Sequence, residues 1–207
     1  VYRILRQQAI KVPKTFVVRS TAPLKGELFR SIWTTYHTPL LVRPIKRHQE
    51  FPSRIVKMFT ELESVIRDYH EKGIDVHVLT YRVKLPVTSL AVLPNFRGEE
   101  VYTPLWVDVF PENESLPQAE SQMRPHLQAP DYRKEHIKGL AVKVYKAIGS
   151  KSPICIDFIN HNNEQVVVNV DLAPSLNKEG RFMKSLATTG VDIGQYIHNC
   201  INNDLKE

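Results

Sequence analysis

The sequence predicts an α+β fold with two lobes. Several segments repeat apolar residues at helical spacing, strand-length apolar runs lie between them, and short turns join some of these runs as antiparallel hairpins. The chain has 207 residues, of which 42% are hydrophobic and 24% charged, a composition that excludes a disordered tail, a collagen-like fibre and a low-complexity linker. A chain of this length buries on the order of 70% of its unfolded surface and needs no disulfide or metal to fold.

The predicted first lobe, residues 1–84, alternates short helices and strands. Proline and glycine set most of the boundaries, because proline removes a backbone donor and glycine adopts the left-handed conformation that closes a helix. We expect, in order, a helix over 1–10, a strand over 15–18, a helix capped by Ser20 or Thr21 and continuing to Trp33, a strand over 40–42, a charged loop over 46–53, a helix from Ile55 to Gly73, and a strand over 75–81.

The predicted second lobe, residues 85–207, carries most of the sheet. Residues 111–130 are rich in Pro, Glu, Gln and Ser, which is typical of a long mobile surface loop. Around this loop we expect strands over 87–93 and 100–110, the latter interrupted at Pro104, a helix over 137–148, a hairpin of 154–159 with 165–172, and a helix over 193–201.

The net charge of +6 favours anionic partners such as nucleotides, acidic substrates or nucleic acid, although a basic surface also serves solubility. Two explanations stay open for the basic clusters: a solvated face, or contact with phosphate groups as in RNA binding. The clusters comprise Arg43, Lys46, Arg47, His48, Arg54 and Lys57, and later Arg133, Lys134, Lys138, Lys143 and Lys146. Apolar runs fall far short of the ~20 residues of a membrane span, so no membrane partner is expected.

The two cysteines, Cys155 and Cys200, are too far apart for a CxxC motif and too few for a disulfide framework. We expect both to be buried, reduced thiols, which indicates a reducing intracellular compartment, the cytoplasm. The chain begins at Val1, within a predicted helix, so we interpret it as a fragment or a processed product.

The final hairpin carries a candidate magnesium site. Asn169 and Asp171 are two residues apart on one strand and therefore share a face, and Asp157 can join them from the facing strand. Three oxygen ligands of this kind suit Mg²⁺. The alternative is that they are solvent-facing strand residues near a turn. The eight histidines form no HxH or HxxxH pair and are interpreted as scattered surface residues.

The order of motifs resembles the D-alanine–D-alanine ligase branch of the ATP-grasp superfamily. The motifs that carry the resemblance are Cys155-Ile-Asp157, Asn169-Val-Asp171-Leu-Ala-Pro174-Ser175, Gly180-Arg-Phe-Met183 and Gly190-Val-Asp192, preceded upstream by Ala9-Ile-Lys-Val-Pro13 and Leu40-Leu-Val-Arg43-Pro44. Each motif is weak alone, and their order and spacing carry the resemblance. It covers nearly the whole chain and lacks only the N-terminal domain of that family.

The resemblance implies two α+β lobes around a nucleotide-sized cleft, with ATP and Mg²⁺ as cofactors. Members of the family form an acyl phosphate from a carboxylate and ATP, which an amine then attacks. By position, Asp157, Asn169 and Asp171 would be the metal ligands. Arg43 stands where the family has a phosphate-contacting lysine, and Leu79, Thr80, Tyr81 and Arg82 stand at the adenine hinge.

Several positions depart from the family pattern, and no catalytic residue can be assigned. The loop over 46–53 contains no glycine, although glycine best allows a backbone to cradle phosphate. The remaining departures are Pro86 for a ribose-binding Glu, Cys155 for an Arg, Asn169 for a metal-binding Glu, Ser175 for a Gly, and Lys178-Glu179-Gly180 for a Ser-containing substrate segment. Two functions follow: a divergent ATP-dependent carboxylate–amine ligase domain, or a catalytically dead derivative that serves as a binding or structural module for protein or RNA in a larger assembly.

Overall fold

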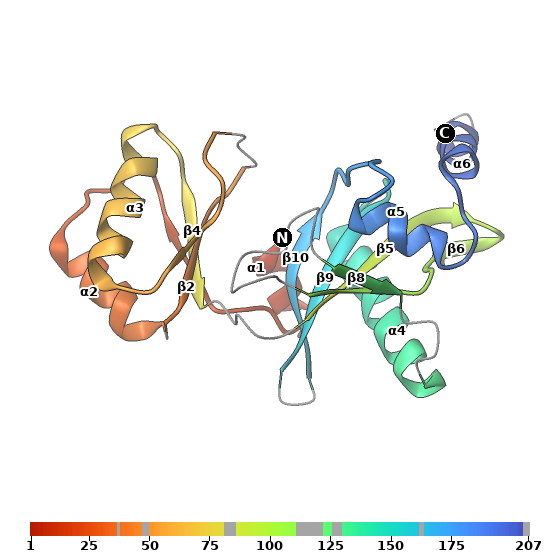
Figure 1. Cartoon of the computed structure of the whole chain (residues 1–207), viewed down its shortest axis with the longest axis horizontal. Helices are drawn as coiled ribbons and strands as arrows, with labels where there is room; N and C mark the ends of the chain where they lie inside the picture. The colour runs from red at the N-terminus through yellow and green to blue at the C-terminus, as the bar shows by residue number, and fades with distance from the viewer. Residues whose placement is uncertain are drawn as a thin grey trace. The chain divides into compact units, whose positions relative to one another are not determined.

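The computed structural model describes residues 1–36, 38–46, 50–80, 86–110, 122–125, 130–161 and 164–204. These residues form two compact units, one of residues 13–80 and one that combines residues 1–12 with residues 86–204 (Figure 1). Each unit packs helices against an antiparallel sheet, which confirms the predicted α+β class. None of the helices in the described part of the chain is long and apolar enough to cross a membrane.

The unit of residues 13–80 is a four-stranded sheet with two helices on one face (Figure 1). Alternation along the strands directs Leu40, Val42, Val76 and Val78 toward the helices, where they join Phe29 and Leu62 in one core. The strands, in the spatial order β1-β4-β2-β3, are β1 Thr15–Val18, β4 Val76–Thr80, β2 Leu40–Pro44 and β3 Arg54–Val56, and the helices are α2 Gly26–Thr35 and α3 Phe59–Glu71.

Two helix starts in this unit differ from the prediction. Residues 54–56 form β3 rather than the first turn of α3, which begins at Phe59 because the Glu61 carboxylate accepts the backbone N–H groups of Lys57 and Met58 at 2.8 and 3.0 Å. Helix α2 begins at Gly26, since Ser20 is not its cap: the Ser20 side chain and backbone N–H donate instead to Asp75, at 2.9 and 2.7 Å.

The second unit is built on a sheet with the strand order β10-β9-β5-β7-β8, and β6 pairs with β5 beside it. Its strands are β5 Val87–Phe96, β6 Glu99–Tyr102, β7 Val107–Phe110, β8 Gln122–Pro125, β9 Ile154–His161 and β10 Glu164–Asp171. Its helices are α1 Tyr2–Gln7, α4 Asp131–Ile148, α5 Arg181–Ala187 and α6 Ile193–Asp204.

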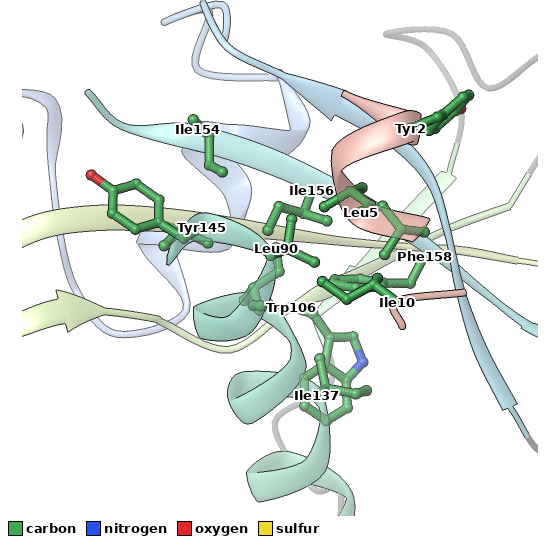
Figure 2. Packing of buried hydrophobic residues seen from close by; sticks show 14 residues of the cluster. Tyr2, Leu5, Ile10, Leu90, Trp106, Ile137, Tyr145, Ile154, Ile156 and Phe158 are labelled. Atoms are coloured by element: carbon green, nitrogen blue, oxygen red, sulfur yellow. The ribbon is translucent and has the colours of Figure 1, made fainter. Parts of the chain in front are cut away.

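The two faces of this sheet bury different cores. On one face, Leu90, Ile156 and Phe158 pack with residues of α1 and α4 (Figure 2). On the other face, Ala91, Leu93 and Cys155 pack with Phe182, Met183 and Leu186 of α5. Because neighbouring strand residues point to opposite faces, a polar residue next to Leu90 or Ile156 faces α5.

Three predictions in this unit need correction. Residues 1–12 belong here rather than to the first lobe, because Leu5 and Ile10 join its core, Tyr2 donates its hydroxyl to the Val168 carbonyl, and the Lys11 carbonyl accepts the Val167 N–H at 2.9 Å. The strand predicted over 100–110 is two strands, β6 and β7. Part of the loop predicted over 111–130 is β8, which pairs with β7, and residues 111–121 and 126–129 lie outside the described residues.

We expect the unit of residues 13–80 to lose stability in acid through Asp75. Its carboxylate accepts the Ser20 N–H, the guanidinium of Arg19 at 2.7 Å and the Ser20 hydroxyl, and these bonds lower the pKa of Asp75 to about 2. A carboxyl with a lowered folded-state pKa stabilises the fold above its unfolded pKa, and that contribution disappears as the pH falls from about 4 to about 2. Denaturant unfolding across this range should show this loss in the wild type and not in Asp75→Asn. Glu71→Gln, a change at an exposed carboxylate of the same unit, should retain it, and the same loss in Asp75→Asn would contradict the assignment.

The core around Leu90 should set the stability of the second unit. Leu90 of β5 is fully buried under α1 and α4. Because its truncation leaves a cavity, Leu90→Ala should lower the free energy of unfolding by about 2–5 kcal/mol. The matched control is Ile197→Ala at a largely exposed position of α6, which should change it by less than ~0.5 kcal/mol. Urea unfolding at neutral pH measures both, and equal effects would show that this core is wrongly placed.

Candidate functional site

Polar side chains from three neighbouring strands, β5, β9 and β10, form a row across one side of the second sheet. Ser89 of β5 lies opposite Asp157 of β9, and Asp157 lies opposite Asn169 of β10. A β-bulge between Val167 and Asn169 sets this last pairing. All three side chains are on the face that α5 covers, next to Ala91 and Cys155. The sequence prediction that Asp157 and Asn169 meet across the hairpin is therefore correct in geometry.

The Asp157 carboxylate is closed by three donors. Its Oδ1 accepts the Ser89 hydroxyl at 2.5 Å, and its Oδ2 accepts the Asn169 amide N–H at 3.1 Å. The third donor is the Arg181 guanidinium, whose Nη1 lies 2.7 Å from Oδ2. The Asp157 side chain is 5% exposed and that of Arg181 is 32% exposed. The result is a buried carboxylate whose neutralising cation belongs to the chain itself.

Helix α5 fixes the position of Arg181. Gly180 precedes the helix, and a Cβ there would lie 2.9 Å from the Asn177 carbonyl, so the turn into α5 requires glycine. One turn further along, the buried Ser185 hydroxyl donates to the Leu105 carbonyl at 2.7 Å and accepts the Ala91 N–H at 3.0 Å. The turn at Gly180 and the hydrogen bonds of Ser185 thus fix the first turn of α5, and Arg181, its first residue, contacts Asp157.

The charges of this site follow from its burial. The neighbouring Asp157 carboxylate raises the pKa of Arg181, so the guanidinium stays charged throughout the normal pH range. Burial, with a further contribution from Asp157, raises the pKa of the Cys155 thiol well above its usual value. Cys155 is therefore a neutral thiol at neutral pH, at the position where the resemblance calls for an arginine.

Asp171, the third residue of the predicted magnesium site, has a different role. It lies opposite Cys155, two residue pairs further along the hairpin than Asn169, and its Oδ1 accepts the backbone N–H of Ala173 at 3.1 Å. This is an Asx-type turn that ends β10 and leads the chain toward α5. The carboxylate is close enough to Arg181 to contribute to raising the pKa of that guanidinium.

The arrangement of Asp157, Asn169 and Asp171 does not fit a divalent cation. Asn169 presents its N–H donor to Asp157, and the flipped amide would place an oxygen against the carboxylate, so this orientation is the favourable one. Arg181 contacts the same carboxylate oxygen with a positive charge. Among the described residues, no group of three or more His, Cys, Asp or Glu side chains is placed to hold a metal ion.

The residues predicted to contact a nucleotide lie in the other unit. By strand alternation, Arg43 of β2 and Leu79 of β4 share the sheet face away from α2 and α3, because Leu40, Val42 and Val78 occupy the helix face. Thr80 pairs with Leu40 and belongs to the helix face. Tyr81 and Arg82 lie outside the described residues, as do residues 47–49 of the predicted phosphate loop.

Basic side chains of α4 are engaged at the surface. Lys134 pairs with Asp131 at 3.1 Å, Lys146 pairs with Glu100 at 3.0 Å, and the Arg133 guanidinium lies 5.6 Å from the centre of the Trp106 ring. These contacts favour the solvated-face interpretation for these three residues. Of the two cysteines, Cys155 is buried as predicted, whereas Cys200 on α6 is only half-buried, and both are free thiols.

Two residues of the site, Ser89 and Arg181, were missed at the level of sequence. Ser89 follows Thr88 in a mainly apolar strand, where a hydroxyl gives no signal without the register of β5 against β9. Arg181 follows Gly180 in one of the motifs quoted above, and a glycine followed by apolar residues at helical spacing is a helix-start signal. Neither pattern shows that the Arg181 side chain reaches from α5 to the Asp157 carboxylate on the sheet.

Removal of the Asp157 charge should destabilise the second unit. Breaking a buried ion pair leaves an uncompensated charge, at a cost of about 3–5 kcal/mol when both partners are fully buried. Since Arg181 is about one third exposed, we expect Asp157→Asn to lower the free energy of unfolding by about 1–3 kcal/mol in denaturant at neutral pH. The control Asp171→Asn retains the acceptor for Ala173 and should have the smaller effect. The reverse order would show that the pair has no structural role.

Comparison with known proteins agrees with this fold. The family model described as "D-ala D-ala ligase C-terminus" matches residues 4–202. Comparison of the sequence with curated proteins found no match. The solved structures that resemble this chain are only 16% identical to it in sequence, so the likeness shows the fold alone.

Among these structures are D-alanine–D-alanine ligases from Bacillus anthracis, complexed with ATP, and from Coxiella burnetii, and D-alanyl-alanine synthetase A from Vibrio cholerae O1 biovar eltor str. N16961. The TM-scores are 0.77, 0.76 and 0.79, each at 16% identity. The matches cover 99%, 95% and 100% of this chain but 64%, 53% and 64% of those chains, so the chain spans less than two thirds of these relatives. On the match over residues 4–202, the chain belongs to the D-ala D-ala ligase C-terminus family and has its ATP-grasp fold.

Proposed function

We propose that this chain is a non-ligating member of its family, a domain with an ATP-grasp fold that serves as a binding or structural module in a larger assembly. The observation that carries the proposal is the closed Asp157 carboxylate. In the ligase reaction that the resemblance implies, this position would hold the metal that neutralises the phosphates. Here the carboxylate is paired with Arg181 and hydrogen-bonded by Ser89 and Asn169.

Further support comes from groups that the reaction would need. An arginine at the position of Cys155 would stabilise the charge that develops during acyl transfer, and a buried neutral thiol cannot supply that charge. In the sequence of the predicted phosphate loop, residues 46–53, bulky side chains stand where glycine would let the backbone approach a phosphate. Both departures weaken transition-state binding, while the cores that hold the fold are intact.

The surface of the described residues supports a protein partner over RNA. Three basic side chains of α4, those of Lys134, Lys146 and Arg133, contact Asp131, Glu100 and the Trp106 ring respectively. On α6, Ile197 and Ile201 are about half exposed and four residues apart, so they lie on one side of the helix. Exposed apolar side chains contribute to protein contacts, whereas RNA binding draws on unpaired basic groups.

The second candidate is an ATP-dependent carboxylate–amine ligase domain. It is favoured by family membership and by the likeness of the fold to a structure that holds ATP. On this alternative, Arg43, Leu79, Thr80, Tyr81 and Arg82 would contact the nucleotide, and Asp157 would have to release Arg181 in order to bind Mg²⁺.

Titration with MgATP separates the two candidates. A ligand that binds only the folded state increases the free energy of unfolding by RT ln(1 + [L]/Kd) and thereby raises the melting temperature. Because the proposal is that this chain does not use ATP, we expect millimolar MgATP to leave its melting temperature unchanged. The titration should use ADP release in the presence of D-alanine as a second readout.

Each result of this titration has a defined meaning. Stabilisation together with D-alanine-dependent ADP release, both lost in Asp171→Ala, would overturn the proposal in favour of the ligase. Stabilisation without ADP release would leave the absence of ligation standing and identify a nucleotide as a partner of the module. No response in either readout supports the proposal as stated.

A further inference from the structure

We infer that the Arg181 guanidinium is the resident cation of the Asp157 carboxylate and that its presence excludes a divalent metal from this position. The proposed function depends in part on this same pairing, whereas the inference does not require that function, because an active ATP-dependent enzyme could also have lost this one metal ligand. It concerns the chemistry of the site itself: the guanidinium of Arg181, which is part of the chain, occupies the position where a dissociable metal ion would bind.

The first step is electrostatic. A carboxylate with a 5% exposed side chain needs a positive charge or several donors, and Asp157 has both. Mg²⁺ binds oxygen ligands at about 2.0–2.1 Å. A metal at that distance from Oδ2 would meet the charged Nη1 of Arg181, which contacts the same atom at 2.7 Å. The two cations cannot share this oxygen without strong repulsion.

The second step is that the helix which carries Arg181 is anchored to the sheet. The Ser185 hydroxyl bridges Leu105 and Ala91, and Phe182 and Met183 are buried in the core on this side of the sheet. A different cation on the same helix shows the contrast. Lys184 pairs with Glu179 at 2.7 Å at the surface, and its side chain is 40% exposed. Lys184 is therefore a matched control for a loss of positive charge from α5.

The third step concerns the groups that remain when the charge of Arg181 is removed. The Asp157 carboxylate would keep the Ser89 hydroxyl and the Asn169 amide beside it, and the Asp171 carboxylate acts on the same guanidinium position. With a cation in place of the guanidinium, the Asn169 amide would have to turn its oxygen toward the ion; two carboxylates with hydroxyl and amide oxygens are then hard ligands of the type that Mg²⁺ and Mn²⁺ accept. Neutralisation of one side chain should thus unmask a metal site.

The test is a Mn²⁺ titration followed by electron paramagnetic resonance, with the melting temperature as the second readout. We expect the wild type and Lys184→Met to show no saturable binding at low millimolar Mn²⁺. Arg181→Met should bind Mn²⁺ at least about ten-fold more tightly, and Mn²⁺ should raise its melting temperature. The double variant Arg181→Met/Asp157→Asn should lose this gain, which assigns the ion to Asp157.

Three results would overturn the inference. The first is saturable Mn²⁺ binding by the wild type that disappears in Asp157→Asn, a result that does not depend on the folding of any Arg181 variant. The second is a folded Arg181→Met that gains no affinity. The third applies if Arg181→Met does not fold. In that case Arg181→Gln, which keeps an N–H donor for Asp157, replaces it, and a folded Arg181→Gln with no gain in Mn²⁺ affinity would contradict the inference. ADP release in the MgATP experiment without Mn²⁺ binding at Asp157 would contradict the proposed function alone.

Discussion

The Asp157 carboxylate lies in a largely apolar sheet, between strands β5 and β10, and the structure around it is organised to neutralise its charge. Arg181 supplies the counter-charge, Ser89 and Asn169 supply neutral donors, and each of the four residues comes from a different element. The carboxylate is satisfied only if three features are correct: the register of β9 against both neighbouring strands, the bulge in β10 and the position of α5 on the sheet. A buried carboxylate of this kind is satisfied only when all of these elements are in place.

This constraint connects the fold to the function. The family fold brings a carboxylate-bearing hairpin to a position where ligases would use it for metal and phosphate chemistry, and in this chain the same carboxylate ties α5 to the sheet. Cys155 shows the same change, since a residue that would carry charge has become part of the α5 core. Residues that would be reserved for a ligand here serve the packing of the domain, which favours a module over a ligase.

Patterns of apolar residues predicted the framework well because burial is the strongest physical signal in a sequence. The hairpin of β9 and β10, the strands β1, β2 and β4, and the helix ends at Gly73 and Gly149 all followed from periodicity and from glycine at positive φ. The errors arose where tertiary contacts decide. Residues 54–56 read as helix but pair with β2, and residues 1–12 precede β1 but pack against α4 and β10.

The site was harder to predict for the same reason. Alternation along a strand correctly placed Asp157, Asn169 and Asp171 on one face, but it could not show which group neutralises them. Arg181 is 24 residues from Asp157 along the chain, and only the seat of α5 brings the two together. A metal and a guanidinium satisfy the same carboxylate, so a sequence that retains the carboxylate does not by itself reveal which of the two cations it holds.

The most direct test of this account is an anomalous-diffraction experiment on crystals grown with MnCl₂ and an ATP analogue. The account predicts that Arg181 stays within hydrogen-bond distance of Asp157 and that no anomalous peak appears beside that carboxylate. A manganese peak that bridges Asp157 and Asn169, with the Arg181 side chain displaced, would contradict it.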